Sequence, residues 1–212
     1  MICALTTNVT RFFREPHHFD HLRTVVLPPL LEKAKRGERV RLWSAACSNG
    51  PEPYSMALCV LSLMPDANNY DIRILATDID TKMIAHARAG CYDSSVISQV
   101  PSDLRSRWFV KTEGAGGRMM GASDELRNLI AFKELNLIGQ WPIKGPFQAI
   151  FCRNVVIYFE EQTQAKIWSR FAPLVEHGGM LYIGHSERLT GPAASEFSSV
   201  GVTAYQKLRV RS

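Results

Sequence analysis

The sequence predicts an α/β fold built on a mainly parallel sheet, and three observations support this. Residues 39–80 read as an apolar strand, a small-residue turn, a helix with apolar positions at helical spacing, and a second strand that ends at Asp78. The nearly all-apolar run 147–152 is typical of a strand that is buried on both faces of a parallel sheet. Helical patterns alternate with these strands, which is the order of βαβ units.

The N-terminal part is predicted to be helical after a short motif. Residues 8–15 place two phenylalanines among polar and basic side chains. This is typical of a cap on the core, or of a segment that directs Arg14 into a pocket. Residues 19–35 carry an apolar stripe at helical spacing. Because proline lacks an N–H group and crowds the preceding turn, Pro28-Pro29 predicts a break or two short helices.

A group of antiparallel strands is predicted to interrupt the α/β order. Residues 107–111, 118–120 and 129–135 have the composition of strands, and the glycine-rich turn 114–117 lies between the first two. We therefore expect one domain over residues 1–212 with an inserted β-subdomain at about residues 106–136. Such an insertion serves as a recognition appendage, a lid or simple decoration.

The α/β order resumes after the insertion. Residues 161–175 predict an amphipathic helix that Gly178-Gly179 ends, and residues 180–184 predict the next strand. Residues 197–205 predict a closing antiparallel pair.

Length, composition and charge limit the class of protein. The chain has 212 residues, of which 46% are hydrophobic and 21% charged, as in one globular domain. The net charge of +5 comes from dispersed lysines and arginines, so we expect no nucleic-acid partner. No apolar run approaches the roughly 20 residues that a membrane span requires, and no signal peptide is evident, so we expect no membrane insertion.

Cysteine and histidine spacing favours neither disulfides nor a metal. The five cysteines are scattered and form no CxxC pair, which predicts reduced thiols in a cytoplasmic protein. Among the six histidines only His17 and His18 are adjacent, and adjacent side chains share a metal ion poorly. We expect no metal site.

Polar residues follow three of the apolar runs: the turn 44–52, Asp78, and Arg153-Asn154. In an open α/β sheet, ligands bind at the carboxyl ends of the strands. The turn has only Gly50 where a dinucleotide fingerprint has three glycines, so a nucleoside without pyrophosphate is favoured. S-adenosylmethionine is the common ligand of this kind, and a carboxylate at Asp78 can accept from its two ribose hydroxyls. On this pattern alone, an ordinary βαβ core unit is the alternative.

Several separated motifs carry a more specific signal. They are Asn8-Val9-Thr10-Arg11-Phe12-Phe13-Arg14-Glu15, Trp43-Ser44-Ala45-Ala46-Cys47-Ser48, Glu52-Pro53-Tyr54-Ser55, Thr77-Asp78-Ile79-Asp80, Asn136-Leu137, Phe151-Cys152-Arg153-Asn154-Val155 and Gly184-His185-Ser186-Glu187. In this order they resemble the catalytic domain of the chemotaxis receptor methyltransferases, which use S-adenosylmethionine to esterify glutamates on bacterial chemoreceptors. The family usually reads Gly-Glu-Glu-Pro where this chain has Gly50-Pro51-Glu52-Pro53, and proline is tolerated in a first helical turn.

The resemblance implies a fold and a set of site residues. The fold is a Rossmann-like methyltransferase sheet of seven strands with a small inserted antiparallel β-subdomain, and the family's helical N-terminal domain is absent from this chain. The implied catalytic residues are Arg14 and Tyr158. The implied residues for S-adenosylmethionine and its product S-adenosylhomocysteine are Asn8, Thr10, Arg14, Glu52, Asp78, Asn136, Leu137, Arg153 and Asn154.

The resemblance also implies where these residues act. Asp78 is expected at the ribose, Asn136 and Leu137 beside the adenine, and Glu52 at the amino-acid or ribose part. Arg153-Asn154 is expected at the methionine end, and Arg14 near the methionine carboxylate or the incoming substrate carboxylate. Simpler interpretations stay open: an ion-pairing Arg153, a turn residue at Asn136, a core-packing Tyr158, and an Asp80 that only caps the next helix.

The implied partner is the cytoplasmic domain of chemoreceptors. In some relatives the β-subdomain captures a receptor C-terminal tail peptide as an added strand, and the same is an expectation here. A monomer is expected. One alternative is a catalytically inactive scaffold or sensor that binds S-adenosylmethionine or S-adenosylhomocysteine. Another is a methyltransferase for nucleic acid or a small molecule, although the amino-methylating DNA enzymes carry an Asn/Asp-Pro-Pro-Tyr type of motif that this chain lacks.

Overall fold

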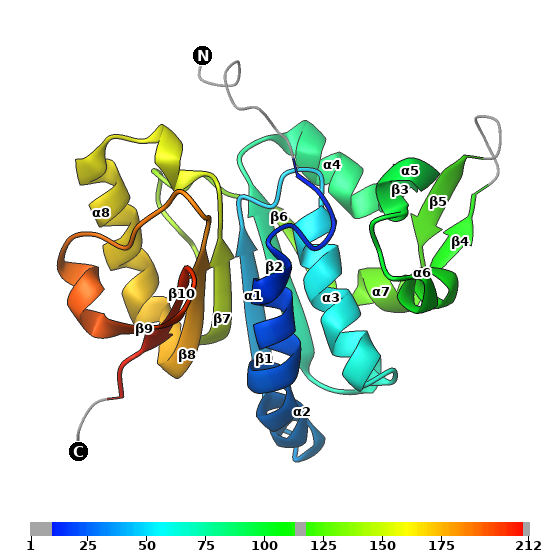
Figure 1. Cartoon of the computed structure of the whole chain (residues 1–212), viewed down its shortest axis with the longest axis horizontal. Coiled ribbons are helices and arrows are strands. Elements are labelled where there is room, and N and C mark those ends of the chain that lie inside the picture. The colour runs from blue at the N-terminus through cyan, green and yellow to red at the C-terminus, as the bar shows by residue number, and fades with distance from the viewer. Residues whose placement is uncertain (1–9, 113–117, 210–212) are drawn as a thin grey trace.

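The computed structural model describes residues 10–112 and 118–209 (Figure 1). Helices and strands alternate along most of it. Their bounds are α1 Pro16–His21, α2 Leu27–Lys35, β1 Val40–Ala45, α3 Pro51–Leu63, β2 Ile72–Asp78, α4 Thr81–Ala89, β3 Cys91–Asp93, α5 Ser94–Ile97, α6 Ser102–Trp108, β4 Phe109–Lys111, β5 Met119–Ala122, α7 Asp124–Asn128, β6 Ile130–Glu134, β7 Phe147–Cys152, α8 Glu161–Phe171, β8 Val175–Ile183, β9 Phe197–Gly201 and β10 Ala204–Lys207.

The main sheet has seven strands in the order β6-β2-β1-β7-β8-β10-β9. The first five in this order run parallel to their neighbours, and β10 is antiparallel to both β8 and β9. A second, three-stranded antiparallel sheet has the order β3-β5-β4. It lies at the opposite end of the molecule from α8 (Figure 1). The predicted α/β fold with a small inserted sheet is confirmed.

Helices cover both faces of the main sheet, and the strands are apolar on both sides for this reason. In β1, Val40 and Leu42 face the core that α1, α2 and α3 complete. Trp43 and Ala45 face the second core under α8. There the Trp43 ring lies 5.1 Å from the ring of Phe171. Burial on both faces explains why β7 reads as a nearly all-apolar run and why β1 is mainly apolar instead of alternating strictly.

The N-terminal helical segment does not break at its prolines. A π-helical turn, Leu22–Val26, connects α1 to α2, so the chain stays helical from Pro16 to Lys35. Pro28 and Pro29 fall in the first turn of α2, directly after the π-helical turn. The wider π turn before them therefore replaces the predicted break.

The inserted sheet consists of different strands from those expected. The sequence placed residues 129–135 in it, but β6 pairs in parallel with β2 at the edge of the main sheet. The third strand of the small sheet is instead β3, which was not predicted. In β6, Ile130 and Phe132 are buried while Ala131 and Lys133 are exposed. An edge strand with one open side alternates in this way, so its pattern reads like that of an antiparallel strand.

The helix after β7 is shorter than predicted. α8 ends at Phe171, a 3-10 turn follows, and β8 begins at Val175. Gly178 and Gly179 therefore lie inside a strand whose pairing with β7 shifts register, instead of ending the helix. The predicted antiparallel pair near the C-terminus is confirmed as β9 and β10.

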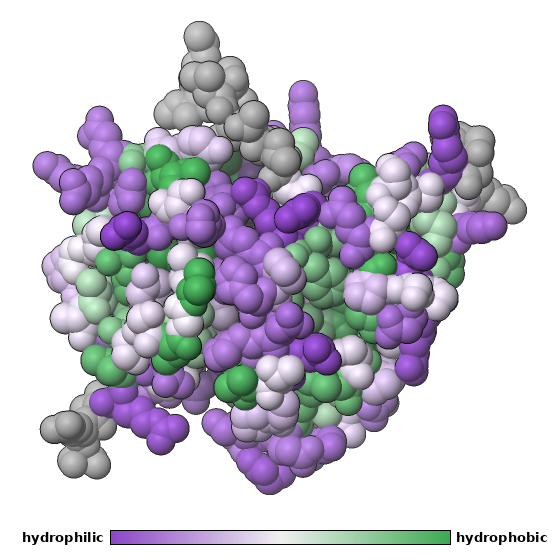
Figure 2. All heavy atoms as spheres, viewed as in Figure 1, coloured by the Kyte–Doolittle hydropathy of each residue, from purple (hydrophilic) through white to green (hydrophobic). Residues whose placement is uncertain are grey.

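The face formed by α1, α3 and the insertion carries apolar surface beside a polar band that follows α1 and α2 (Figure 2). A cavity of about 380 Å³ lies on this side, with Phe13, Phe19, Cys59 and Leu104 in its wall. Its lining includes none of the predicted strand-end residues. No helix in residues 10–112 and 118–209 has both the length and the hydropathy needed to cross a bilayer.

Candidate functional site

The polar residues at the strand ends meet along the carboxyl-terminal edge of the main sheet, which is called the strand edge below. β1, β2 and β7 are parallel neighbours, so their carboxyl ends share that edge. The Ser48 N–H group, after β1, donates to Asp78 Oδ2 at 2.7 Å. Arg153 Nε, after β7, donates to Glu52 Oε2 at 2.7 Å, at the start of α3. The structure thus brings together the three polar clusters that the sequence predicts there.

The turn between β1 and α3 has a strained backbone. Ala46, Ser48 and Gly50 have φ angles of 63°, 50° and 108°, in or near the left-handed region. A Cβ atom on Gly50 would lie 2.5 Å from the hydroxyl oxygen of Tyr92. That hydroxyl donates to Asn49 O at 2.7 Å. Because Tyr92 belongs to β3, the inserted sheet helps to fix the turn.

We expect Gly50→Ala to destabilise the protein more than Gly37→Ala does. Both glycines have positive φ, but a Cβ atom on Gly37 meets nothing within 4 Å. The left-handed backbone alone costs roughly 1–2 kcal/mol with a side chain, and overpacking adds about 1–3 kcal/mol. Urea unfolding of both variants measures the difference. Equal losses would mean that the contact with Tyr92 does not constrain the turn.

Asp78 is half-buried, and backbone N–H groups donate hydrogen bonds to both of its carboxylate oxygens. Oδ2 accepts from Ser48 N–H, and Oδ1 accepts from Asp80 N–H at 2.9 Å. Burial raises the pKa of Asp78 above its usual range. A carboxylate has about four acceptor positions, so Asp78 can still accept from a ligand. The Asp80 side chain instead accepts from Lys82 and Met83 N–H groups, which confirms it as the cap of α4.

Arg153 lies at the centre of a buried polar network. Its Nε donates to Glu52 Oε2, while Glu52 Oε1 accepts from Ser44 Oγ at 2.7 Å. Its Nη1 donates to Arg14 O at 2.6 Å and lies 3.6 Å from Glu15 Oε2. Arg153 therefore forms the ion pair that the simpler interpretation describes. It also ties the N-terminal motif to the strand edge.

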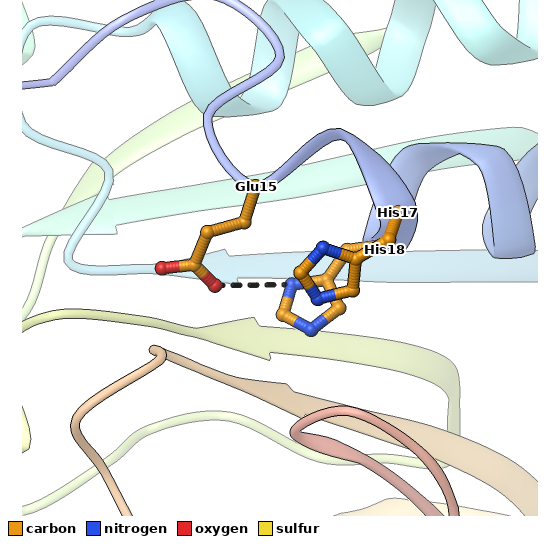
Figure 3. Close-up of side chains that lie close together, drawn as sticks. All are labelled: Glu15, His17 and His18. Carbon is orange, nitrogen blue, oxygen red and sulfur yellow. Dashed lines mark ion pairs between the residues drawn. The ribbon is translucent and has the colours of Figure 1, made fainter.

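Glu15, His17 and His18 form the only group of potential metal ligands among the described residues. Figure 3 shows the Glu15 carboxylate directed at the His18 ring, 3.5 Å from its Nδ1. His18 Nε2 lies 3.1 Å from Val202 O, and Nδ1 lies 3.2 Å from Arg153 Nη1. A guanidinium can only donate, so the Nδ1 lone pair is already used. The fixed charge of Arg153 would also repel a metal ion.

His18 makes stability depend on pH. Burial, and secondly the charge of Arg153, lowers the pKa of His18 from 6.5 to about 3. The unfolded state therefore binds a proton at a higher pH than the folded state does. The free energy of unfolding falls as the pH drops from about 6.5 to about 3. The expected loss is about 2 kcal/mol at pH 5, at about 1.4 kcal/mol per pH unit. Urea unfolding from pH 7 to pH 4 should show a smaller slope for His18→Gln. Identical slopes would contradict the assignment.

Glu187, to which sequence analysis assigned no role, holds the segment after β7. Asn154, the first residue of this segment after Arg153, has a φ angle of 58°. Its side chain donates to Glu15 Oε1 at 3.4 Å. The buried Glu187 carboxylate accepts from the backbone N–H groups of residues 154–157. The sequence offers one signal for this role, which is that Glu187 is a charged residue shortly after an apolar strand. The donors give no signal, because they are backbone N–H groups about thirty residues away.

The loops after β2 and β6 add an apolar part to this edge. Ile79 and Ile138 are 52% and 55% exposed, and Leu137 is buried between the loop and the core under α8. Asn136 is exposed, and its Oδ1 accepts from Ile138 N–H at 2.9 Å, as a turn residue does. Sequence analysis missed Ile79, whose signal is a large apolar side chain directly after Asp78.

Of the remaining predicted residues, Arg14 and Tyr158 are connected to the segment around Arg153 through hydrogen bonds of their backbone groups. Tyr158 ends the 3-10 turn Val156–Tyr158 and is 51% exposed, so it does not belong to the core. Arg14 is half-buried between two residues of positive φ, Phe13 and Glu15. Thr10 is half-buried as well, whereas Asn8 lies outside the described residues.

The turn after β1 contains polar atoms that a ligand would satisfy. Within the described chain, Ser48 Oγ and Asn49 Oδ1 are buried without a hydrogen-bond partner. Each such atom costs about 1–3 kcal/mol, so a pair in one turn indicates a polar ligand there. The surroundings fit S-adenosylmethionine. They offer carboxylate oxygens at Asp78 for ribose hydroxyls, apolar side chains for adenine, and charged groups at Glu52 and Arg153 for an amino acid.

Similar known proteins identify the family to which this chain belongs. The SAM-binding domain of the CheR methyltransferases matches residues 8–206. A probable chemotaxis protein methyltransferase of Rhizobium etli is 58% identical over 206 residues, which cover 97% of this chain and 77% of that protein. The chemotaxis protein methyltransferases of Salmonella typhimurium and Escherichia coli are 42% and 40% identical, covering 96% of this chain and 68% of each relative. The chain belongs to the CheR family of S-adenosylmethionine-dependent chemotaxis methyltransferases.

Proposed function

We propose that this methyltransferase esterifies glutamate side chains in the cytoplasmic part of bacterial chemoreceptors. The observation that supports this best is the strand edge itself. There Asp78, Glu52 and Arg153 stand around a turn with two unpartnered polar atoms, in a chain of the chemotaxis methyltransferase family. A cytoplasmic location agrees with the free thiols at Cys47, Cys59, Cys91 and Cys152.

The site residues divide by chemistry. Asp78 accepts from the ribose hydroxyls, and Asn136 and Leu137 border the adenine together with Ile79. Thr10, Arg14, Glu52, Arg153 and Asn154 surround the amino-acid part. Asn8, which lies outside the described residues, is proposed as a further cofactor-binding residue of the same motif.

The reaction needs positioning more than it needs a base. When bound, S-adenosylmethionine supplies a methyl group that passes to a glutamate oxygen while its sulfur keeps the bonding electron pair. A glutamate side chain has a pKa of about 4.3 and is already ionised at neutral pH. The protein must therefore hold the carboxylate in line with the methyl group and exclude water. Tyr158, which is exposed beside the strand edge, borders the reacting groups.

Arg14 is the proposed binding group for the substrate carboxylate. We expect Arg14→Ala to lower kcat/KM for a receptor fragment about 100-fold, because a charge-assisted, bidentate contact is lost. Transfer of labelled methyl groups from S-adenosylmethionine to the fragment measures this. Arg11→Ala is the matched control, because Arg11 is an exposed arginine of the same motif. Wild-type rates for Arg14→Ala would exclude this role.

The same assay separates the alternative function. Binding of S-adenosylhomocysteine without methyl transfer to any receptor fragment would favour an inactive scaffold or sensor. Mass spectrometry of the product should place the methyl group on glutamate side chains. Methyl groups found on other residues would contradict the proposal.

The inserted sheet is the proposed binding site for a receptor tail peptide. β4 is an edge strand, and Val110 in its middle is 55% exposed. An extended peptide can add to such an edge through backbone hydrogen bonds. The turn 114–117, which also motivated this expectation, lies outside the described residues. No binding of a tail peptide at millimolar concentration would exclude this role. A monomer is expected in sedimentation experiments.

A further inference from the structure

Among residues 10–112 and 118–209, the donors to the buried Glu187 carboxylate are all backbone N–H groups. The residue follows β8 and is 3% exposed. Oε2 accepts from Gly184 N–H at 2.5 Å and from Asn154 N–H at 2.9 Å. Oε1 accepts from Val155 N–H at 2.9 Å and from Val156 N–H at 2.7 Å, and Ile157 N–H lies 3.4 Å away. One carboxylate therefore satisfies consecutive N–H groups of the segment after β7.

Residues 154–157 take an irregular path that brings these N–H groups together. Asn154 has a φ angle of 58°, and Val155 has φ and ψ angles of −127° and −37°. Successive N–H groups that converge in this way form a concave anion site. In most sites of this kind the anion is a ligand, but here the chain supplies its own. Without the carboxylate, these part-buried N–H groups would lose their partner and the segment would lose the contact that fixes its path.

The segment carries predicted site residues at both of its ends. Arg153 directly precedes it, and Asn154 begins it. The Tyr158 N–H group donates to Val155 O at 3.3 Å in the 3-10 turn that closes it. Any rotation of the segment would move the Tyr158 side chain relative to the ligand turn after β1. A displacement of about 1 Å at a methyl-transfer site can lower the rate about 100-fold.

Gly184 shows how closely the two loops approach. A Cβ atom on Gly184 would lie 2.6 Å from both the backbone nitrogen and Nδ2 of Asn154. It would also lie 2.8 Å from Glu187 Oε2. Only a residue without a side chain leaves room for Asn154 to reach the carboxylate.

We infer that Glu187 is a positioning residue for methyl transfer, acting through residues 154–158 rather than by touching the substrate. This inference rests on the proposed function. Glu187→Gln keeps the size of the side chain but replaces one oxygen with an amide NH₂ group. This group can only donate, so it cannot accept from the backbone N–H groups that face it. We expect kcat to fall about 100-fold. We expect the Kd for S-adenosylmethionine to rise less than ten-fold, because Asn154 is the one proposed cofactor residue that hydrogen-bonds Glu187 among the described contacts, while Asp78 and the turn after β1 are held by other groups.

The test is a double-mutant cycle of Glu187→Gln with Tyr158→Phe, measured as kcat with a receptor fragment. If Glu187 acts through the segment that carries Tyr158, the double variant should be no slower than the slower single variant. Glu196→Gln is the control, because it removes the partner of the buried Lys207 far from the site. It should lower stability and leave kcat unchanged.

Several outcomes would overturn the inference. One is wild-type kcat in folded Glu187→Gln. Another, when Tyr158→Phe alone also lowers kcat, is a double variant whose loss is the product of the two single losses. If Glu187→Gln does not fold, Gly184→Ala decides, because its Cβ atom separates Asn154 from the Glu187 carboxylate without removing the carboxyl group. A 100-fold fall in its kcat with retained S-adenosylmethionine binding supports the inference, and an unchanged kcat or a lack of folding overturns it. Absence of turnover in the wild type would be a different failure, since it overturns the proposed function itself.

Discussion

Replacing Asp78 with alanine is expected to weaken S-adenosylmethionine binding at least 100-fold. Two hydrogen bonds from ribose hydroxyls to a carboxylate are each worth about 1.5–3 kcal/mol, so their loss exceeds the 2.7 kcal/mol that corresponds to this factor. The variant also loses the hydrogen bond that Ser48 N–H, in the turn after β1, donates to Asp78 Oδ2. Isothermal titration with S-adenosylmethionine and with S-adenosylhomocysteine measures the effect. Both ligands carry the ribose, so both should lose affinity equally.

Asp80→Ala is the matched control for this experiment. Asp80 is an acid only two residues away, but its side chain caps α4. The variant should lose about 1 kcal/mol of stability, the usual value of an N-cap, and keep its affinity for S-adenosylmethionine. If Asp78→Ala binds as tightly as Asp80→Ala, Asp78 does not hold the ribose.

Replacing Arg153 with methionine is expected to have the largest effect on stability. The Arg153 side chain is almost fully buried, and the change leaves the buried Glu52 carboxylate without its cation. Removing one partner of a buried ion pair costs about 3–5 kcal/mol. Thermal and urea unfolding measure the loss, which should be accompanied by loss of S-adenosylmethionine binding.

A double variant and an exposed control sharpen this prediction. Arg153→Met with Glu52→Gln removes both charges, and it should recover part of the stability lost in the single variant. Arg36→Ala removes an exposed pair with Glu38 and should change stability by no more than about 1 kcal/mol. A loss for Arg153→Met as small as that for Arg36→Ala would show that the buried network does not stabilise the fold.

The sequence predicts the centre of the fold better than its edges. β1 and β7 are buried on both faces and are mainly apolar, and Asp78 marks the end of β2. β6 has one open side, so its alternating pattern does not distinguish a parallel edge strand from an antiparallel one. The π-helical turn before Pro28 depends on how the whole helical segment packs, which no local pattern records.

The sequence predicts the part of the site that consists of polar side chains at strand ends. Strand-end positions identify Asp78 and Arg153, and the structure joins their surroundings through the turn after β1. Glu187 escapes prediction because its partners are backbone N–H groups of a distant segment, and peptide groups are the same in every sequence. The resemblance to known methyltransferases includes the motif that contains Glu187 but does not give the role of this residue.

A crystal structure of the protein with S-adenosylhomocysteine would show directly whether Asp78 holds the ribose. We expect both ribose hydroxyls to lie within hydrogen-bond distance of the Asp78 carboxylate, with the ligand bound at the turn between β1 and α3. A ligand bound elsewhere, for example in the cavity beside Phe19 and Leu104, or with its ribose away from Asp78, would contradict it.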